Sequence, residues 1–296
     1  MALAVLGAVA FSGKAIIVKL AYQHGVDAVT LIMLRMVFAL PFFMAMAWWG
    51  SRKSPSSAPV ALTRQDWLGV GWLGLTGYYL ASFLDFAGLQ YITASLERLI
   101  LYLNPTLVLV LGWVFAGRRI GRAQALGMAI SYGGVLLVFG HEVTLQGADV
   151  TLGAVLVFLS AISYALYLFY SGEMVQRLGS LRLVGLATSV ACLLCIAQFA
   201  VLRPMDVLWA VAPQVVWLSV LNATLCTVVP VMLVMMAIER VGSGLAAQVG
   251  MVGPMSTMLM GVLLLDEPFT GWLVGGTALV IAGVAVCSRA RAADAV

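Results

Sequence analysis

The chain is dominated by long apolar segments separated by short polar ones. Runs of about 20 mostly apolar residues, the length that an α-helix needs to cross a bilayer, recur along the whole sequence. Gly, Pro or charged residues bound each run. The pattern predicts ten transmembrane helices, at residues 1–21, 28–49, 67–89, 94–116, 123–140, 152–171, 182–202, 214–238, 243–265 and 270–288.

The connections between the predicted helices are short, except for the polar segment 51–66. Short connections place consecutive helices side by side and antiparallel. The composition agrees with a chain solvated mainly by lipid, since 63% of its residues are hydrophobic and 9% are charged. Soluble domains have about a quarter charged residues. The fold class that follows is an all-α integral membrane protein with ten transmembrane helices.

Basic residues between the helices indicate how the chain lies in the membrane. With the N-terminus in the cytoplasm, the inner segments hold Arg52, Lys53, Arg64, Arg118, Arg119, Arg122, Arg177, Arg182, Arg240, Arg289 and Arg291. The outer loops then hold Arg203 as their one basic residue. Cytoplasmic loops carry the excess of Lys and Arg. We therefore expect a multi-pass protein of a bacterial-type inner membrane, with both termini in the cytoplasm.

The two halves of the chain resemble each other at an offset of 149 residues (254 minus 105). At this offset Pro105 falls on Pro254, and Gly112, Gly127 and Gly134 fall on Gly261, Gly276 and Gly283. The predicted halves are residues 1–140 and 152–288, with five helices each. Because five is odd, the second half enters the membrane inverted. Inverted repeats are typical of secondary transporters, whose substrate site lies near the midplane between the halves.

Segments of both halves also resemble a known family. They are FSGKAIIVKLA and LIMLRMVFALP, the stretch 89–138, and the stretch 238–284, in which LLLDEP precedes a Gly-rich last helix. Each half resembles the EamA repeat of the drug/metabolite transporter superfamily. The resemblance implies a ten-helix carrier whose central cavity is lined largely by spans 1, 3, 4, 6, 8 and 9. Its members move amino acids, nucleotide sugars, phosphorylated sugars, cationic drugs and other metabolites. One departure is Gly117-Arg118-Arg119, where the family often has an acidic residue after the glycine.

Charged residues inside or near the ends of the predicted helices all belong to the first half. They are Lys14, Lys19, Arg35, Asp85, Glu97 and Arg98. A charge at the centre of a membrane helix costs about 2.5–3.5 kcal/mol. Such groups are expected to face the interior of the bundle and to be paired. By depth, these six converge on the outer half of the bundle.

Three interpretations of these charges remain open. They can form a structural network in which Asp85 pairs with Arg35 or Arg98, while Lys19 and Glu97 extend toward the interface. They can bind substrate, in which case four cations against two anions favour an anionic or carboxylate-bearing solute. The third interpretation is proton coupling through Asp85 or Glu97, because carboxylate relays are common in pumps.

Lys14 is the sharpest candidate for substrate binding or gating, because it lies closest to the midplane and has no acidic neighbour in sequence. Arg98 and Tyr102 share one helix face at a spacing of four residues. The full set of candidates is Lys14, Arg35, Tyr78, Asp85, Arg98, Tyr102, Ser163, Tyr164 and Gln248. Pro105 and its repeat partner Pro254 each remove a backbone hydrogen bond, which predicts a hinge at the repeat interface.

Other classes of function find little support in the sequence. No nucleotide-binding loop, metal-ligand spacing or catalytic set is present, so we expect no enzyme, no cofactor and no metal. No clustered basic patch indicates nucleic acid. The predicted partners are a small-molecule substrate and the lipid bilayer, and the oligomeric state is left open, a monomer being one option. The main hypothesis is a secondary carrier or exporter. A membrane-embedded enzyme and a channel or accessory subunit are the alternatives.

Overall fold

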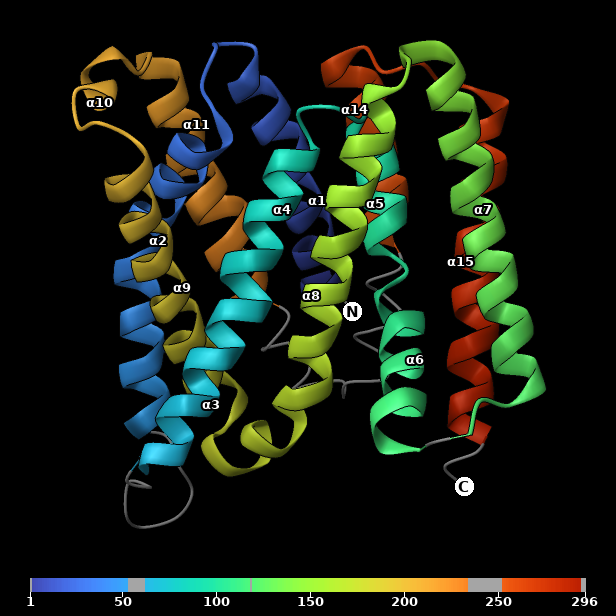
Figure 1. Ribbon diagram of the computed structural model, residues 1–296, viewed down its shortest axis with the longest axis horizontal. Helices are drawn as coiled ribbons and strands as arrows, with labels where there is room; N and C mark the ends of the chain where they lie inside the picture. Colours follow the sequence, from blue (N-terminus) through green and yellow to red (C-terminus); the bar gives the residue numbers. More distant parts are fainter. Residues whose placement is uncertain (1, 53–61, 118, 234–251, 294–296) are drawn as a thin grey trace.

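The computed structural model describes residues 2–52, 62–117, 119–233 and 252–293, and these residues form an antiparallel bundle of helices (Figure 1). The helices of the first half are α1 (Ala2–Tyr22), α2 (Ala28–Arg52), α3 (Arg64–Gly74), η1 (Leu75–Leu80), α4 (Ala81–Gly88), α5 (Ala94–Leu101), α6 (Asn104–Ala116) and α7 (Arg122–Gln146). Those of the second half are α8 (Asp149–Leu178), α9 (Ser180–Leu202), α10 (Val207–Ala210), α11 (Pro213–Ala223), η2 (Thr224–Val228), α14 (Val252–Leu265) and α15 (Gly271–Ala293). The fold class is therefore all-α, as the sequence predicts.

Seven helical segments of the described chain are long and apolar enough to cross a membrane. They are Ala28–Arg52, Ala94–Ala116, Arg122–Leu145, Asp149–Gly172, Ser180–Leu202, Pro213–Leu233 and Gly271–Arg289, and Gly253–Leu265 is a shorter apolar helix. Large apolar side chains such as Trp48, Trp113 and Phe115 lie exposed on the bundle, as lipid-facing residues do. The helices support a multi-pass membrane protein, while the number ten stays a prediction.

Two predicted helices are irregular in the structure. The span predicted at 94–116 is interrupted at Tyr102 and Leu103, so that α5 and α6 are separate short helices. The span predicted at 67–89 contains the π-helical segment η1, and a second π-helical segment, η2, lies at the equivalent place of the other half (75 plus 149 gives 224). Local π-helical turns are frequent at functional sites.

The two halves are related by the packing of equivalent helices. The most extensive helix pairs are α7 with α15 and α2 with α9, and each pair joins a helix to its own repeat partner. A Cβ added to Gly127 would lie 2.6 Å from the carbonyl oxygen of Gly283, and one added to Gly134 would lie 2.6 Å from that of Gly276. Because Gly127 corresponds to Gly276 and Gly134 to Gly283, each of these contacts is the repeat equivalent of the other. Equivalent helices run in opposite directions (Figure 1), which agrees with inverted halves.

The ends of the helices have opposite charge. We call the end with Arg52, Arg64, Arg119, Arg122, Arg177 and Arg182 the basic end. The other, the acidic end, carries Asp27, Glu142, Asp149, Asp206, Asp266 and Glu267. The basic residue expected among these acids, Arg203, lies 3.1 Å from a carboxylate oxygen of Asp27. The charge pattern of the sequence thus corresponds to two distinct ends of the folded bundle.

Candidate functional site

A buried group of charges lies where α1, α4 and α5 meet, in the part of the bundle nearer the acidic end. Nζ of Lys14 lies 2.5 Å from Oδ2 of Asp85 and 3.3 Å from Oε1 of Glu97. Asp85 is in the last turn of α4, and Glu97 is in the first turn of α5. All three side chains are buried, and Glu97 is completely inaccessible. Asp85 therefore pairs with Lys14, and not with Arg35 or Arg98 as the sequence suggested.

Arg98 joins this group to the second half of the chain. Its Nε donates to the hydroxyl of Thr257 in α14 at 3.1 Å, and its NH2 donates to the carbonyl of Phe11 at 3.2 Å. Its guanidinium also lies 5.4 Å from the centre of the Phe11 ring, within the range of cation–π attraction. Nε of Arg98 is 3.9 Å from Glu97. We call Lys14, Asp85, Glu97 and Arg98 the central cluster.

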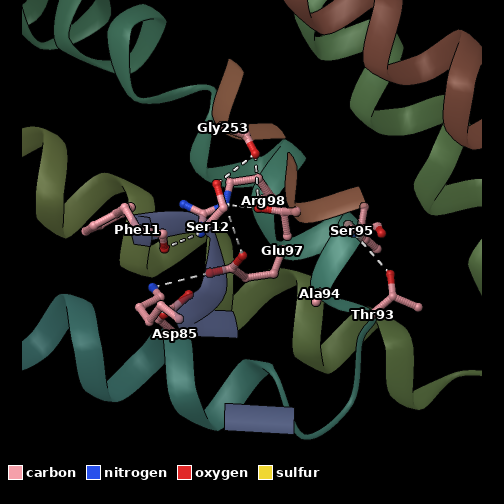
Figure 2. A network of polar contacts seen from close by, with 12 residues as sticks. Phe11, Ser12, Asp85, Thr93, Ala94, Ser95, Glu97, Arg98 and Gly253 are labelled. Atoms are coloured by element: carbon pink, nitrogen blue, oxygen red, sulfur yellow. Dashed lines mark hydrogen bonds and ion pairs between the residues drawn. The ribbon is translucent and has the colours of Figure 1, made fainter. Parts of the chain in front are cut away.

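Helix α1 is held against α14 beside the central cluster. The hydroxyl of Ser12 donates to the carbonyl of Gly253 at 2.9 Å and to that of Ala8 at 2.8 Å. Figure 2 shows Phe11, Ser12, Gly253 and Arg98 gathered on one side of Glu97, with Asp85 on the other. From α11, Nδ2 of Asn222 lies 3.5 Å from the carbonyl of Lys14. The central cluster therefore lies at the interface between the halves.

The central cluster contains two cations and two carboxylates, so its charges balance. Oδ1 of Asp85 and both carboxylate oxygens of Glu97 are buried and accept no hydrogen bond from any described residue. Two neighbouring carboxylates thus share the ammonium group of Lys14. This arrangement can hold a proton or receive a cationic group.

Arg35 of α2 is a buried cation outside the central cluster. Its Nε donates to the hydroxyl of Thr227 in η2 at 3.1 Å, and its guanidinium lies 5.2 Å from the centre of the Phe86 ring. Among the described residues no carboxylate lies within 4.0 Å of it. Lys19, by contrast, donates to the carbonyl of Ile92 at 2.8 Å near the acidic end. The two cations in excess of the carboxylates therefore lie apart, Lys19 near the acidic end and Arg35 beside η2.

Two of the three candidate tyrosines, Tyr78 and Tyr164, lie in an aromatic group at η1 and α8. The hydroxyl oxygens of Tyr78 and Tyr167 are 3.3 Å apart, and the ring of Tyr164 stacks on that of Tyr167 with centres 5.5 Å apart. Ser163 donates to the carbonyl of Thr76 at 2.7 Å, and Ser160 donates to that of Ala81 at 2.7 Å. These serines satisfy carbonyls in and just after the π-helical segment η1, and a role of Ser163 in substrate binding or gating stays a prediction.

The remaining candidates lie around the interruption of the span 94–116 or outside the described chain. Tyr102 and Leu103 form the break between α5 and α6, and Pro105 is in the first turn of α6, where a proline is tolerated. Pro254 lies in α14 beside Gly253, the acceptor for Ser12. Gln248 lies outside the described residues. Whether Pro105 and Pro254 act as hinges stays a prediction.

Sequence reasoning did not single out Phe11, Ser12 or Thr257. Phe11 lies three residues before Lys14, a spacing that shares a helix face, and this was a usable signal. Ser12 and Thr257 are neutral hydroxyls in apolar helices, a pattern without distinctive chemistry. Among the described residues, no group of three or more His, Cys, Asp and Glu side chains could hold a metal ion. The four cysteines are free and buried.

Comparison with known proteins gives one family and a shared fold. The family model described as "EamA-like transporter family" matches residues 1–140 and 151–289. The uncharacterized transporter YcbK of Bacillus subtilis is 30% identical over 269 residues, which are 88% of this chain and 84% of that protein. The uncharacterized transporter YvbV of the same organism is 26% identical over 220 residues, 71% of this chain and 68% of its own. A crystal structure titled only as that of a protein matches with a TM-score of 0.63 and 18% identity, covering 96% of this chain and 95% of the other.

Proposed function

The chain belongs to the EamA-like transporter family and is a multi-pass membrane transporter, and from this premise we propose that it is a secondary carrier that exports small metabolites by alternating access. The observation that carries the proposal is the central cluster. Four buried charges join α1, α4 and α5 of one half, and Arg98 and Ser12 contact α14 of the other. A site at the interface of inverted halves is exposed to alternate sides when the halves rock.

The substrate class that we propose is an amino-acid-like or anionic solute. Arg35 supplies a buried positive charge that no described carboxylate neutralises within 4.0 Å. A guanidinium binds a carboxylate through two parallel hydrogen bonds. The paired carboxylates of Asp85 and Glu97 would receive an ammonium group of the same solute. The residues proposed to contact the substrate first are therefore Arg35, Asp85 and Glu97, together with Lys14 and Arg98 of the central cluster. Tyr78 and Tyr164 lie farther along the interface.

Proton coupling is proposed for the pair Asp85 and Glu97. Both carboxylates are buried beside Lys14, and three of their four oxygens accept no hydrogen bond from described residues. Binding of a proton would release Lys14 from one of its partners. Binding or release of this proton would then change the net charge of the central cluster, and with it the affinity of the cluster for a charged solute.

The orientation follows from the charged ends of the bundle. We propose that the basic end faces the cytoplasm and the acidic end faces outward, in a bacterial-type inner membrane with ten transmembrane helices. The positive-inside rule supports this placement. The same orientation puts the N- and C-termini in the cytoplasm, and it places the central cluster in the outward half of the bundle.

A comparison of metabolites tests the proposal and does not require the substrate to be identified beforehand. Cells with and without the protein are grown in parallel, and small molecules in the medium and the cytosol are quantified by mass spectrometry. The proposal expects a carboxylate-bearing solute to be enriched in the medium and depleted in the cytosol when the protein is present. A cell that produces the Arg35→Gln variant at equal membrane abundance is the matched control, because this substitution leaves the ion pair of Lys14 and Asp85 in place. Identical profiles in all three cells would refute the proposal.

A further inference from the structure

A second set of polar contacts holds the first turn of α5 at the acidic end. Glu267, between α14 and α15, accepts hydrogen bonds from the backbone N–H of Ala94 at 2.6 Å and of Ser95 at 3.2 Å. It also accepts the hydroxyl of Ser95 at 2.6 Å. The free N–H groups at a helix N-terminus favour a negative charge. This contact joins the halves, because Glu267 belongs to the second and α5 to the first.

The backbone around Glu267 directs its carboxylate toward the first turn of α5. Asp266 has φ of 54°, a left-handed conformation that turns the chain at the end of α14. The N–H of Glu267 donates to the carbonyl of Gly261 at 3.1 Å. A Cβ on Gly261 would lie 2.6 Å from Oε2 of Glu267, so the glycine leaves room for the carboxylate. Glu267 is therefore fixed in place by its own segment as well as by α5.

The equivalent position of the first half has different chemistry. Gly117, which corresponds to Asp266 (117 plus 149 gives 266), also has a left-handed φ, of 63°. The residue that follows it, and that corresponds to Glu267, is Arg118. An arginine side chain has no hydrogen-bond acceptor, so it cannot cap a helix N-terminus as Glu267 does. At this position of the repeat the sequence therefore supplies a hydrogen-bond acceptor in the second half and none in the first.

Two further side chains hold the segment that leads into α5. Lys19 of α1 donates to the carbonyl of Ile92 at 2.8 Å. Glu142 of α7 accepts a hydrogen bond from the hydroxyl of Thr93, which itself accepts the N–H of Leu96 at 3.1 Å. The other carboxylate oxygen of Glu142 is buried and has no hydrogen-bond partner among the described residues. A small hollow here is lined by Thr93, Ser95, Glu142 and Glu267 among others. Helices α1 and α7 and the connection between α14 and α15 thus converge on one short segment.

This segment is directly continuous with the central cluster. Ser95, which Glu267 binds, is two residues before Glu97 and three before Arg98 (Figure 2). Helix α5 has 8 residues and ends at Leu101, before α6, so the residues that Glu267 binds and the residues Glu97 and Arg98 of the central cluster belong to one short helix. A movement of the first turn of α5 away from Glu267 also moves Glu97 and Arg98 away from Lys14 and Phe11.

We propose that Glu267 is a positioning residue that closes the acidic end of the carrier and, through α5, holds Glu97 and Arg98 against α1. This inference rests on the proposed function, because closure of the acidic end matters only for a carrier that works by alternating access. Opening of the acidic end requires the three hydrogen bonds of Glu267 to break. The hydrogen bonds of Glu267 therefore couple two things: whether the central cluster is accessible from the acidic end, and whether Glu97 and Arg98 stay in contact with α1.

The distance between two labelled positions tests the closure directly. Gln90, exposed at the end of α4, and Gly271, where an added Cβ meets nothing within 4 Å, are replaced by cysteine and spin-labelled. The native cysteines are buried, which disfavours their labelling. In proteoliposomes without added solute, Glu267→Gln should raise the population of long distances roughly tenfold, as expected for the loss of one hydrogen bond to a charged group. Ser95→Ala should give a smaller change in the same direction.

Asp266→Asn is the matched control, because it removes the neighbouring carboxylate and asparagine tolerates the left-handed backbone. It should leave the distances unchanged. Equal distance distributions for Glu267→Gln and the unmodified chain would overturn the inference, as would a lower unfolding temperature without longer distances. The measurement needs no substrate. A chain that shows the Glu267→Gln change but transports no solute would contradict the proposed function and not the closure by Glu267.

Discussion

Lys14 of α1 and Asp85 of α4 form a buried ion pair, with Nζ and Oδ2 2.5 Å apart, although 71 residues separate them in the chain. Each charge would cost about 2.5–3.5 kcal/mol at the centre of an isolated membrane helix. The pair offsets this cost only while α1 and α4 stay in contact. Because Glu97 lies 3.3 Å from the same ammonium, a change at any of the three alters the other two.

Lys14→Met should destabilise the protein strongly, because it leaves Asp85 and Glu97 buried without their shared cation. Breaking a buried ion pair by removal of one partner costs about 3–5 kcal/mol. Thermal unfolding in detergent measures the effect. The double variant Lys14→Met with Asp85→Asn removes one cation and one anion, and it should recover part of the loss. If the losses of stability of the two single variants simply add in the double variant, Lys14 and Asp85 do not stabilise each other as an ion pair.

Asp85→Asn and Glu97→Gln should make transport independent of a proton gradient. In the unmodified protein, a pH difference imposed across proteoliposomes should change the initial rate of transport, because a proton on either carboxylate changes the charge around Lys14. The double variant should show one rate with and without the gradient, and each single variant should respond less than the unmodified protein. A lack of response in the unmodified protein would rule out these two residues as coupling groups.

Arg35→Gln should weaken the binding of a carboxylate-bearing substrate without a large loss of stability. Among the described residues Arg35 has no ionic partner within 4.0 Å, so its removal leaves no described carboxylate unpaired. A hydrogen bond to a charged group contributes about 1.5–3 kcal/mol, which is an increase of KM by roughly 10- to 100-fold. Arg203→Gln, which removes an exposed partner of Asp27, is the control and should leave KM unchanged. An unchanged KM for Arg35→Gln would exclude Arg35 from the site.

The sequence predicted the apolar spans and the repeat well, because lipid imposes long apolar runs and close packing imposes glycine. Gly127 and Gly134 mark the contact of α7 with α15 for that reason. The pairing of Lys14 with Asp85 was not predictable, because it depends on how separate helices rotate against each other. The π-helical segments were also missed, since the altered hydrogen bonding at η1 leaves no mark in composition. Thr257, the partner of Arg98, is one neutral hydroxyl among many.

Gly134→Ala should destabilise the bundle, whereas Gly133→Ala should not. A Cβ at Gly134 would lie 2.6 Å from the carbonyl oxygen of Gly276, while one at Gly133 would meet nothing within 4 Å. Overpacking of a tight interface costs about 1–3 kcal/mol. An alanine in an open helical position favours the helix by about 1 kcal/mol over glycine. Equal unfolding temperatures for the two variants would show that α7 and α15 do not pack closely at this point.

The carboxylate of Asp27, in the loop between α1 and α2, should stabilise the protein at neutral pH and lose this effect in acid. Burial raises the pKa of Asp27, but hydrogen bonds from Thr30 and Arg203 outweigh burial and hold this pKa below its ordinary value of 3.8. A carboxyl group whose pKa is lowered by folding stabilises the protein above its unfolded pKa and loses this effect as the pH falls through the folded one. The unfolding temperature of Asp27→Asn should therefore fall less between neutral pH and pH about 3 than that of the unmodified chain. Parallel curves would contradict the assignment.

A counterflow experiment tests whether a solute binds at the central cluster, between the two halves, and is carried across the membrane. Proteoliposomes are loaded with one carboxylate-bearing solute at high concentration and then given a trace of the same solute with a label. The account predicts that, for the true substrate, the label transiently accumulates above its equilibrium level in liposomes with the unmodified chain. It predicts no accumulation with Lys14→Met at equal reconstitution. Accumulation that is undiminished in Lys14→Met, or simple equilibration of every solute through the unmodified chain, would contradict it.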